Sequence, residues 1–316
     1  MAVRSSNGYL GFVKQASKGT ALVPTKFCRL SAAESLEIVQ DVYEERSLNG
    51  DEELDVILKV GNKPGGSFST LVRPDLAAAI MAFVLGADSV ATGTTHTHTI
   101  TRAATVPWLS IERGLDNYER FEDCKINQVV INGAAGQPLS IDVSYIGIDS
   151  DIVSTATATY ETNEPFMFHD GTFTVNASGD TTIKAFTLTI NRNLEEIQTT
   201  SYKRDDMLES AFSIDLNYSL VFLASDAKYP AILYGAGAAI VDTLHDGAFI
   251  ASFVYGTGAT ARQFEFTLPA LKTISAKKNL DPQTKAVILE VSAKAIKSAS
   301  AIITVECINT TAAAYV

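Results

Sequence analysis

The 316-residue sequence is poor in the side chains that carry most enzyme chemistry. It has four histidines, one tryptophan and three cysteines, and the cysteines lie far apart at Cys28, Cys124 and Cys307. No two of them have the spacing of a zinc or redox motif, and three scattered cysteines do not make a disulfide framework. The cysteine pattern therefore argues against a disulfide-stapled secreted domain and indicates synthesis in a reducing compartment.

Long apolar runs are also missing. No stretch approaches the roughly 20 consecutive apolar residues that a membrane-spanning helix requires. The first thirty residues contain two arginines and three lysines but no sustained apolar core. We therefore expect neither a signal peptide nor a membrane span.

Basic residues are outnumbered by acidic ones. The chain has 25 Lys and Arg against 36 Asp and Glu, a formal net charge of −11. This balance argues against nucleic-acid binding by neutralisation of phosphates, but it suits a surface past which DNA moves, because like charges repel. At 46% hydrophobic and 19% charged residues the composition is that of a globular protein, and the length allows two ordinary domains.

Motifs that would indicate catalysis are absent or incomplete. Residues 61–66, Gly-Asn-Lys-Pro-Gly-Gly, lack the Gly-Lys-Ser/Thr ending of a phosphate-binding loop. We expect them to separate two strands, residues 55–60 and 67–72. His169 and His245 each precede an aspartate, but the chain has no G-x-S-x-G elbow to supply a nucleophile. The sequence therefore predicts no enzyme activity.

His96 and His98 alternate with threonines in residues 92–100 and would project from the same face of a strand. Two histidines at this spacing can share a metal ion, but no Asp, Glu, Cys or third His stands nearby in the sequence to complete the site. Threonine is a good strand former. We favour an exposed strand over a metal site, and we expect no cofactor.

Apolar and polar residues alternate with a period of two along much of the sequence. The stretch from Trp108 to Asp149 holds three such runs, residues 108–111, 124–131 and 139–147, separated by turn-forming residues. In the third run Leu, Ile, Val and Tyr alternate with Ser and Asp. This pattern predicts an antiparallel meander with one buried face and one wet face.

Residues 74–85 have the features of a helix that packs on a sheet. Pro74 suits the first turn, Asp75 favours the positive N-terminal end, and Gly86 can end the helix. Four apolar residues form one stripe along it. They are Leu76, Ile80, Phe83 and Val84.

The order of strands, one helix and three strands occurs twice. A shorter helix-like run, residues 230–234, takes the second helix position, and the run 287–293 corresponds to 139–145. The other strand runs of the second pass are 186–190, 194–198, 212–220, 249–255, 263–274 and 302–308. The sequence thus predicts a mainly β protein of two tandem domains, residues 1–155 and 156–316, each with one packing helix.

The residues of the meander also carry a resemblance. The pattern from Glu112 to Gly147, with YxRFxxCKINxVxI followed by AGQPLSIDVSYIG, resembles the tail tube (major tail) proteins of long-tailed, non-contractile bacteriophages. Weaker similarity extends to residues 8–12, 19–21 and 186–196. The match lies in the general residue pattern and not in catalytic residues, because this family has no active-site fingerprint.

The resemblance implies a fold and a function. It implies two β-sandwich or barrel folds whose sheets join those of neighbouring copies into an oligomeric β-barrel ring. The rings stack into a tube, and genome DNA passes through it during ejection without specific binding. The implied partners are the tape measure protein and the tail terminator and baseplate proteins. The implied location is the virion tail, with assembly in the host cytoplasm.

Two features of this implied assembly stay open. If both halves are tube folds, three chains make a ring with pseudo-six-fold symmetry, which we favour; if one half lines the bore, six chains are needed. The rival functions are another virion β-protein, such as a distal-tail ring or decoration protein, and an enzyme or carbohydrate-binding β-sandwich. The scattered histidines and the single Trp108 weigh against the last two.

Two oppositely charged regions are candidates for contact between subunits. Between Asp41 and Asp55 lie seven acidic residues and one arginine, and between Lys272 and Lys297 lie six lysines and two acids. They are either independent solvated surfaces or two sides of an interface that repeats along a filament. The candidate contact residues are Glu44, Glu45, Asp51, Glu52, Glu53, Lys272, Lys277, Lys278 and Lys285.

Overall fold

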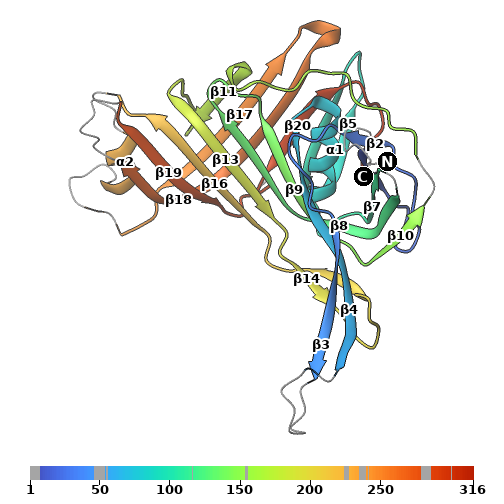
Figure 1. Ribbon diagram of the computed structural model, residues 1–316. Coiled ribbons are helices and arrows are strands. Elements are labelled where there is room, and N and C mark those ends of the chain that lie inside the picture. Colours follow the sequence, from blue (N-terminus) through green and yellow to red (C-terminus); the bar gives the residue numbers. More distant parts are fainter. Residues whose placement is uncertain are drawn as a thin grey trace.

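The structure is a computed structural model that describes residues 8–45, 54, 56–115, 117–153, 156–223, 228–234, 240, 242–278, 286–299 and 301–316. Its described part is mainly antiparallel β-sheet with two α-helices, as Figure 1 shows. The first half contains β1 (Tyr9–Lys14), β2 (Lys26–Cys28), β3 (Glu37–Glu45), β4 (Val56–Leu71), α1 (Pro74–Leu85), β5 (Gly86–Ala91), β6 (His96–Arg102), β7 (Leu109–Gly114), β8 (Tyr118–Ala134), β9 (Ser140–Ile146) and β10 (Asp149–Val153).

The second half contains the remaining elements. They are β11 (Gly171–Val175), β12 (Ser178–Gly179), β13 (Ile183–Asn191), β14 (Leu194–Ile197), β15 (Asp206–Glu209), β16 (Ser213–Val221), α2 (Lys228–Tyr234), β17 (Asp246–Tyr255), β18 (Arg262–Lys278), β19 (Ile288–Ala295) and β20 (Thr304–Asn309), with short 3-10 turns at Phe168–Asp170 and Gly258–Thr260. The expected mainly β class, the meander β7–β8–β9 and a helix in each half are confirmed. The described strands do not close into a barrel.

One large sheet runs through both halves of the chain. Its strand order is β3–β4–β9–β8–β13–β16–β19–β18, and every neighbouring pair is antiparallel. We call it the main sheet. Strand direction alternates at each of the seven steps, so β3 and β18 have opposite senses in the ladder at its two margins.

β8 and β18 are the longest strands, at 17 residues each, and each belongs to two sheets. The N-terminal half of β8 pairs with β7 and β10, and its C-terminal half pairs with β9 and β13. The N-terminal half of β18 pairs with β17 and β20, and its C-terminal half pairs with β19. Six further strands extend these smaller sheets, as β7–β1–β2, β17–β11–β12 and β20–β6–β5. β14 and β15 form a separate two-stranded sheet.

The glycine cluster at residues 61–66 does not separate two strands. β4 runs through it without interruption, so the predicted break is wrong. Gly66 has a φ of 153°, and a Cβ there would lie 2.5 Å from the carbonyl oxygen of Ser35. The glycine therefore allows the chain before β3 to approach the strand backbone closely.

α1 is buried on all sides. Every residue from Pro74 to Leu85 except Asp75 is buried, whereas the stripe read from the sequence predicted one packed face only. The helix contacts strands of both halves, including β6, β8 and β18. It is the centre of a single apolar cluster that includes side chains of both halves. None of the helices in the described residues is long and apolar enough to cross a membrane.

Both ends of α1 are satisfied by residues distant in sequence. At the N-terminus the Glu161 carboxylate accepts the backbone N–H groups of Asp75 and Leu76, each at 3.0 Å. At the C-terminus Arg192 donates from Nε to the Val84 carbonyl and from Nη2 to the Leu85 carbonyl, each at 2.6 Å. Water cannot reach the terminal N–H and C=O groups of a buried helix. These two side chains satisfy those groups and so allow the helix to be buried.

Replacing Glu161 with alanine should lower the free energy of unfolding by about 1–2 kcal/mol, because two N–H groups lose their acceptor and the helix N-terminus loses an anion. Glu164→Ala is the matched control, since that side chain is exposed on the same segment. Urea denaturation of both variants measures the difference. Equal stability of the two variants would show that the cap contributes nothing.

Candidate assembly surfaces

The main sheet has one polar face that continues across the two halves. In β9, Ser140, Asp142 and Ser144 alternate with fully buried residues and stay partly exposed. Asp142 accepts a hydrogen bond from Ser69 of β4 and another from Asn132 of β8, and Asn132 in turn accepts one from Thr187 of β13. This ladder of polar side chains crosses four strands, so the predicted wet face is a continuous surface.

The two halves join edge to edge within this sheet. β8 pairs with β13 in a register that runs from Ala134 opposite Ala185 to Gln128 opposite Asn191. Thr187 Oγ1 donates to Asn132 Oδ1 at 3.0 Å across the junction, and Ile190 and Val129 pack behind it with no exposed surface. The junction therefore has the hydrogen bonds and packing of a sheet interior.

Both outer margins of the main sheet are open in the described part of the chain. β3 has a strand partner on one side only, β4. β18 pairs with β17 as far as Lys272, and the Thr273 backbone N–H still donates to the His245 carbonyl at 3.0 Å; from residue 274 to Lys278 its strand partner is β19 alone. Unpaired edges of this kind readily accept a strand of another chain. The two edges differ from each other, so they suit a head-to-tail contact.

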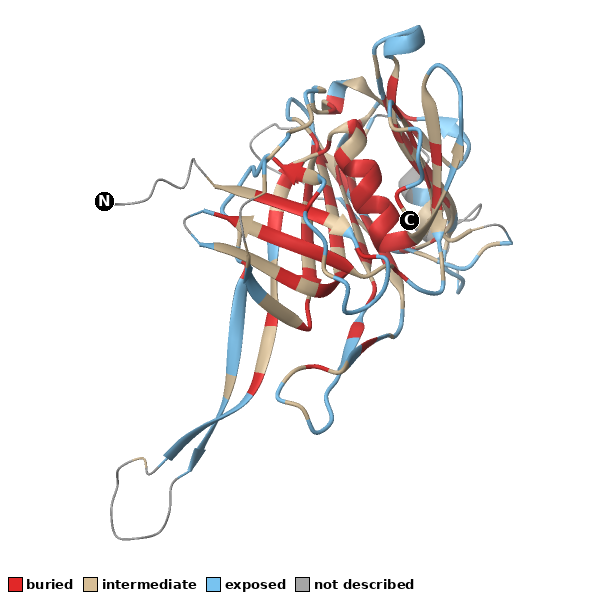
Figure 2. Ribbon diagram, turned by 90° about the vertical axis from the view of Figure 1, so that its right-hand side faces the viewer, coloured by how far each residue is buried: buried red, intermediate tan, exposed pale blue. Residues whose placement is uncertain are grey.

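The hairpin of β3 and β4 projects from the body of the protein. In Figure 2 its two strands extend as a pale, exposed arm. We call residues 38–45 and 56–60 the arm. Its exposed apolar side chains are Ile38, Val39, Val42, Tyr43, Val56, Ile57, Leu58 and Val60, each 40–58% exposed. An arm with this much exposed apolar surface is typical of a protein that binds a partner there.

The predicted contact residues fall into separate places. Glu44 and Glu45 are exposed at the outer end of β3, and Lys277 and Lys278 are exposed at the C-terminal end of β18. Lys272 forms an ion pair with Asp246 at 2.5 Å. Asp51, Glu52, Glu53 and Lys285 lie outside the described residues.

Strand direction separates the two charged groups. Seven antiparallel steps lead from β3 to β18, so the C-terminal ends of these strands lie at opposite ends of the main sheet. Among the described members no ion pair joins the acidic group to the lysines. Within one chain Glu44 and Glu45 therefore lie at the opposite end of the main sheet from Lys277 and Lys278.

His98 is buried, which corrects the prediction of an exposed strand for this residue. Its side chain has no exposed surface, and it lies between Asp88 and the C-terminal segment. Nδ1 is 2.9 Å from Asp88 Oδ2, and Nε2 is 2.9 Å from the Thr311 carbonyl oxygen. In the described residues no group of three or more His, Cys, Asp and Glu could hold a metal ion.

Both partners of His98 are acceptors, so only the imidazolium donates to both at once. Burial lowers the pKa of His98, but the bonds to Asp88 and Thr311 outweigh it and raise the pKa above its ordinary value of 6.5. A raised folded-state pKa gives stability that is complete below pH 6.5 and is lost as pH rises through the higher folded value. The Tyr315 ring of the C-terminal segment packs on His98 with ring centroids 4.8 Å apart, so below the folded pKa of His98 a charged histidine holds this segment.

We therefore expect wild-type stability to fall as pH rises from about 6.5 toward the folded pKa of His98. The His98→Gln variant, which has no charge to lose, should be less stable at pH 6 and should not show this fall. Thermal melting at several pH values measures both. The same pH slope in the variant would show that another group titrates.

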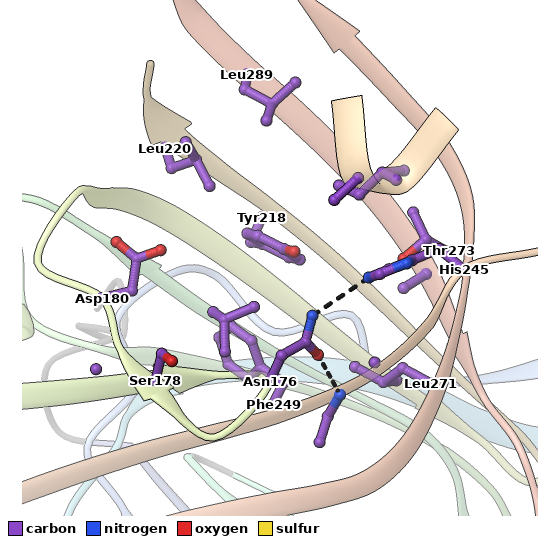
Figure 3. A pocket seen from close by; sticks show the side chains of 17 residues that line it. Asn176, Ser178, Asp180, Tyr218, Leu220, His245, Phe249, Leu271, Thr273 and Leu289 are labelled. Atoms are coloured by element: carbon purple, nitrogen blue, oxygen red, sulfur yellow. Dashed lines mark hydrogen bonds between the residues drawn. The ribbon is translucent and has the colours of Figure 1, made fainter. Parts of the chain in front are cut away.

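A cavity of about 300 Å³ lies in the second half, beneath α2. Leu220, Leu271 and Leu289 line it, and Figure 3 shows the side chains of Asn176 and His245 together at one side. Asn176 Nδ2 is 3.3 Å from His245 Nε2. The lining is mainly apolar.

The three cysteines are all free and buried. Burial raises the pKa of each thiol, which keeps it protonated and unreactive at neutral pH. Cysteine chemistry therefore has no place at the surfaces described above.

Comparison with known proteins agrees with these surfaces. Residues 5–304 match the model of a family described as phage tail tube protein. No curated protein matches the chain. A match over nearly the whole length assigns the family, which consists of structural proteins of the phage tail. The chain belongs to the phage tail tube protein family.

Proposed function

We propose that copies of this chain join edge to edge into rings, and that the rings stack into the tail tube of a long-tailed, non-contractile phage, the conduit for DNA ejection. One observation carries the proposal. In the described part of the chain the main sheet ends in two different edges without a second strand partner, at β3 and at residues 274–278 of β18. Because the edges are unlike, one copy can offer β3 to the β18 edge of the next, and this contact repeats until the ring closes.

We propose that the chain holds two tube folds in tandem, residues 1–155 and 156–316. The strand pairings support this. β4–β9–β8–β7–β1 in the first half has the same pairing order as β16–β19–β18–β17–β11 in the second. In each half a helix follows the first of these strands, α1 after β4 and α2 after β16.

A chain with two such folds needs three copies for a ring with pseudo-six-fold symmetry. The β8–β13 junction then makes every second joint of the ring, and a contact between copies makes the others. The hexameric ring remains the alternative if the halves do not contribute equally to the bore. Counting subunits per ring decides between the two.

The polar face of the main sheet is the surface we assign to the bore. It carries Asp142, Asp215 and Glu290 among serines, threonines and asparagines, and Lys294 is paired with Asp215 at 3.4 Å. Such a face stays wet and does not neutralise phosphates, so genome DNA passes without specific binding. The tape measure protein inside the tube and the terminator and baseplate proteins at its ends are the further partners we propose.

Stacking of rings follows from the ends of the sheet. Glu44 and Glu45 lie at one end of the main sheet, and Lys277 and Lys278 lie at the other. When rings stack head to tail, the acidic end of one faces the basic end of the next. This arrangement brings together opposite charges that lie at opposite ends of the main sheet within one chain.

Reversing Glu44 and Glu45 to lysine should shorten or abolish tubes, because like charges then face each other between rings. The fold should be unaffected, since both side chains are exposed. Reversal of Glu195, an exposed acid on β14, is the matched control. Negative-stain electron microscopy measures tube length. Tubes of normal length in the Glu44 and Glu45 variant would remove these residues from the stacking contact.

The proposed function as a whole is tested with the purified wild-type protein. Negative-stain microscopy and sedimentation at increasing protein concentration should show rings and hollow tubes. Single rings that never stack would indicate a distal-tail ring, and a monomer at all concentrations would contradict polymerisation.

A further inference from the structure

We infer that β3 of one copy pairs antiparallel with the C-terminal half of β18 of a second copy, in a register that places Glu37 opposite Lys277 and Val39 opposite Ser275. This inference rests on the proposed ring and adds the strand pair and the register. The occupant of each open edge is thus a second copy of this chain.

β8 of the first half and β18 of the second are equivalent strands. β8 changes register with β9 between Ile126 and Gln128, and β18 changes register with β19 between Thr273 and Ser275. Each bulge skips one residue at the point where the long strand leaves its smaller sheet. Gln128 therefore corresponds to Ser275, and Val130, two residues on, corresponds to Lys277.

β3 of the first half is equivalent to β13 of the second, as the residues that lie opposite one another from strand to strand show. In the first half the residues in line are Glu37, Gly65, Ile146 and Lys125. In the second half they are Thr189, Asp215, Lys294 and Lys272. Lys125 and Lys272 both lie two residues before their bulges, so the two lines match. Glu37 thus corresponds to Thr189, and Val39 corresponds to Asn191.

The pairing of β13 with β8 within the chain is the template for the pairing of β3 with β18 of a neighbouring copy. Within the chain Thr189 is opposite Val130, and Asn191 is opposite Gln128. Substituting the equivalent residues gives Glu37 opposite Lys277 and Val39 opposite Ser275, with Ile38 opposite Ala276 between them. Each of these residues belongs to an edge that has no second strand partner in the described chain.

The side chains suit this register. Glu37 and Lys277 are both exposed and of opposite charge, and directly opposite residues in a sheet interact most strongly. Ile38 is 40% exposed in the single chain, whereas its counterpart Ile190 is completely buried. A neighbouring copy would bring Ile38 onto the core face of β18 and β19, which is bordered by the apolar cavity of Figure 3.

Other registers fit less well. A shift by one residue turns Ile38 from the core face to the wet face and brings Glu37 to the core. A shift by two in one direction places Glu37 opposite Ser275, so Lys277 keeps Glu290 of β19 opposite it on one side but loses the acid on the β3 side. The charges and the apolar residue therefore select the same register as the ladder does.

The test is a disulfide between copies. Opposite residues in an antiparallel pair have Cα atoms about 4.5–5.5 Å apart, which fits a disulfide. The double variant Val39→Cys, Ser275→Cys, assembled and oxidised, should give a ladder of covalent oligomers on a non-reducing gel. The largest oligomer on the gel should contain as many chains as one ring, which is three for the proposed trimer. The double variant Val39→Cys, Lys277→Cys tests the register shifted by two and should cross-link at most a tenth as much.

A second pair of variants tests the contact without cysteines. Glu37→Lys and Lys277→Glu should each reduce ring formation at least tenfold, and the two together should restore it. Suppose that the wild-type protein forms tubes. The register is then overturned, and the tube is not, if the Val39→Cys, Ser275→Cys variant does not cross-link, if the Val39→Cys, Lys277→Cys variant cross-links equally, or if the double charge reversal does not restore ring formation. If the wild-type protein forms neither rings nor tubes, the proposed function fails and the register fails with it.

Discussion

Replacing Arg192 with alanine will lower the free energy of unfolding by about 3–5 kcal/mol, the cost of removing one partner from a buried charged network. Arg192 has no exposed surface. It donates to the carbonyls of Val84, Leu85 and Ala103 and forms an ion pair with Glu209 at 2.6 Å. Alanine leaves these carbonyls without their donor at a buried helix end and leaves Glu209 without its partner. Urea denaturation followed by circular dichroism measures the loss.

Arg102→Ala is the matched control for this prediction. Arg102 is exposed, and its guanidinium lies 4.7 Å from the Phe212 ring, against 5.0 Å for that of Arg192. Both variants therefore lose a contact with the same ring, but only one uncaps α1. We expect the Arg102 variant to lose less than about 1 kcal/mol. Equal losses in the two would show that ring contact, and not the cap, accounts for the role of Arg192.

Serine at four apolar positions of the arm, Val42, Tyr43, Ile57 and Leu58, will abolish tube formation at concentrations where the wild-type protein assembles. Each of these side chains is more than half exposed in the single chain. Full burial of such side chains is worth about 1.5–3 kcal/mol each. If only a third of that total is realised between copies, its loss of about 2–4 kcal/mol weakens association by roughly 30- to 1000-fold.

The arm variant should keep its fold, because the four side chains add little to the core of a single chain. Thermal melting of the unassembled protein should differ from wild type by no more than a few degrees. Serine at Ile152, which is 78% exposed on β10, is the control at another surface. Assembly of the arm variant at the wild-type concentration, or loss of assembly in the Ile152 control, would contradict this account of the arm.

The strands of the main sheet could be predicted because their environment repeats with period two. In β9 the alternation of Ile141, Val143 and Tyr145 with polar residues reflects a core on one side and water on the other. A single sequence contains this information, since it is local. The meander and the helix at residues 74–85 were predictable for the same reason.

What could not be predicted depends on contacts between distant segments. Nothing around Arg192 in the sequence indicates that α1, more than 100 residues earlier, ends at its guanidinium. Asp88 lies ten residues from His98, and β5 and β6 bring the two together, so the acceptor of that histidine was not found by spacing. Gly66 looked like turn chemistry because the backbone of Ser35 that requires it is supplied by another segment.

The assembly surfaces show the same division. The acidic run from Asp41 and the lysines from Lys272 were evident from composition alone. The placement of Glu44 and Glu45 at one end of the main sheet and of Lys277 and Lys278 at the other depends on strand order and direction, which the sequence does not state. The exposed apolar side chains of the arm read as ordinary strand residues, and only their exposure in the folded chain marks them as a contact surface.

The most direct test of the central claim is a reconstruction of the assembled wild-type protein by electron cryomicroscopy at a resolution that separates strands. We predict a hollow tube in which the main sheet continues from copy to copy, with β3 of each copy hydrogen-bonded to β18 of the next. A particle in which both of these edges remain unpaired, or in which neighbouring copies touch only through loops, would contradict the account.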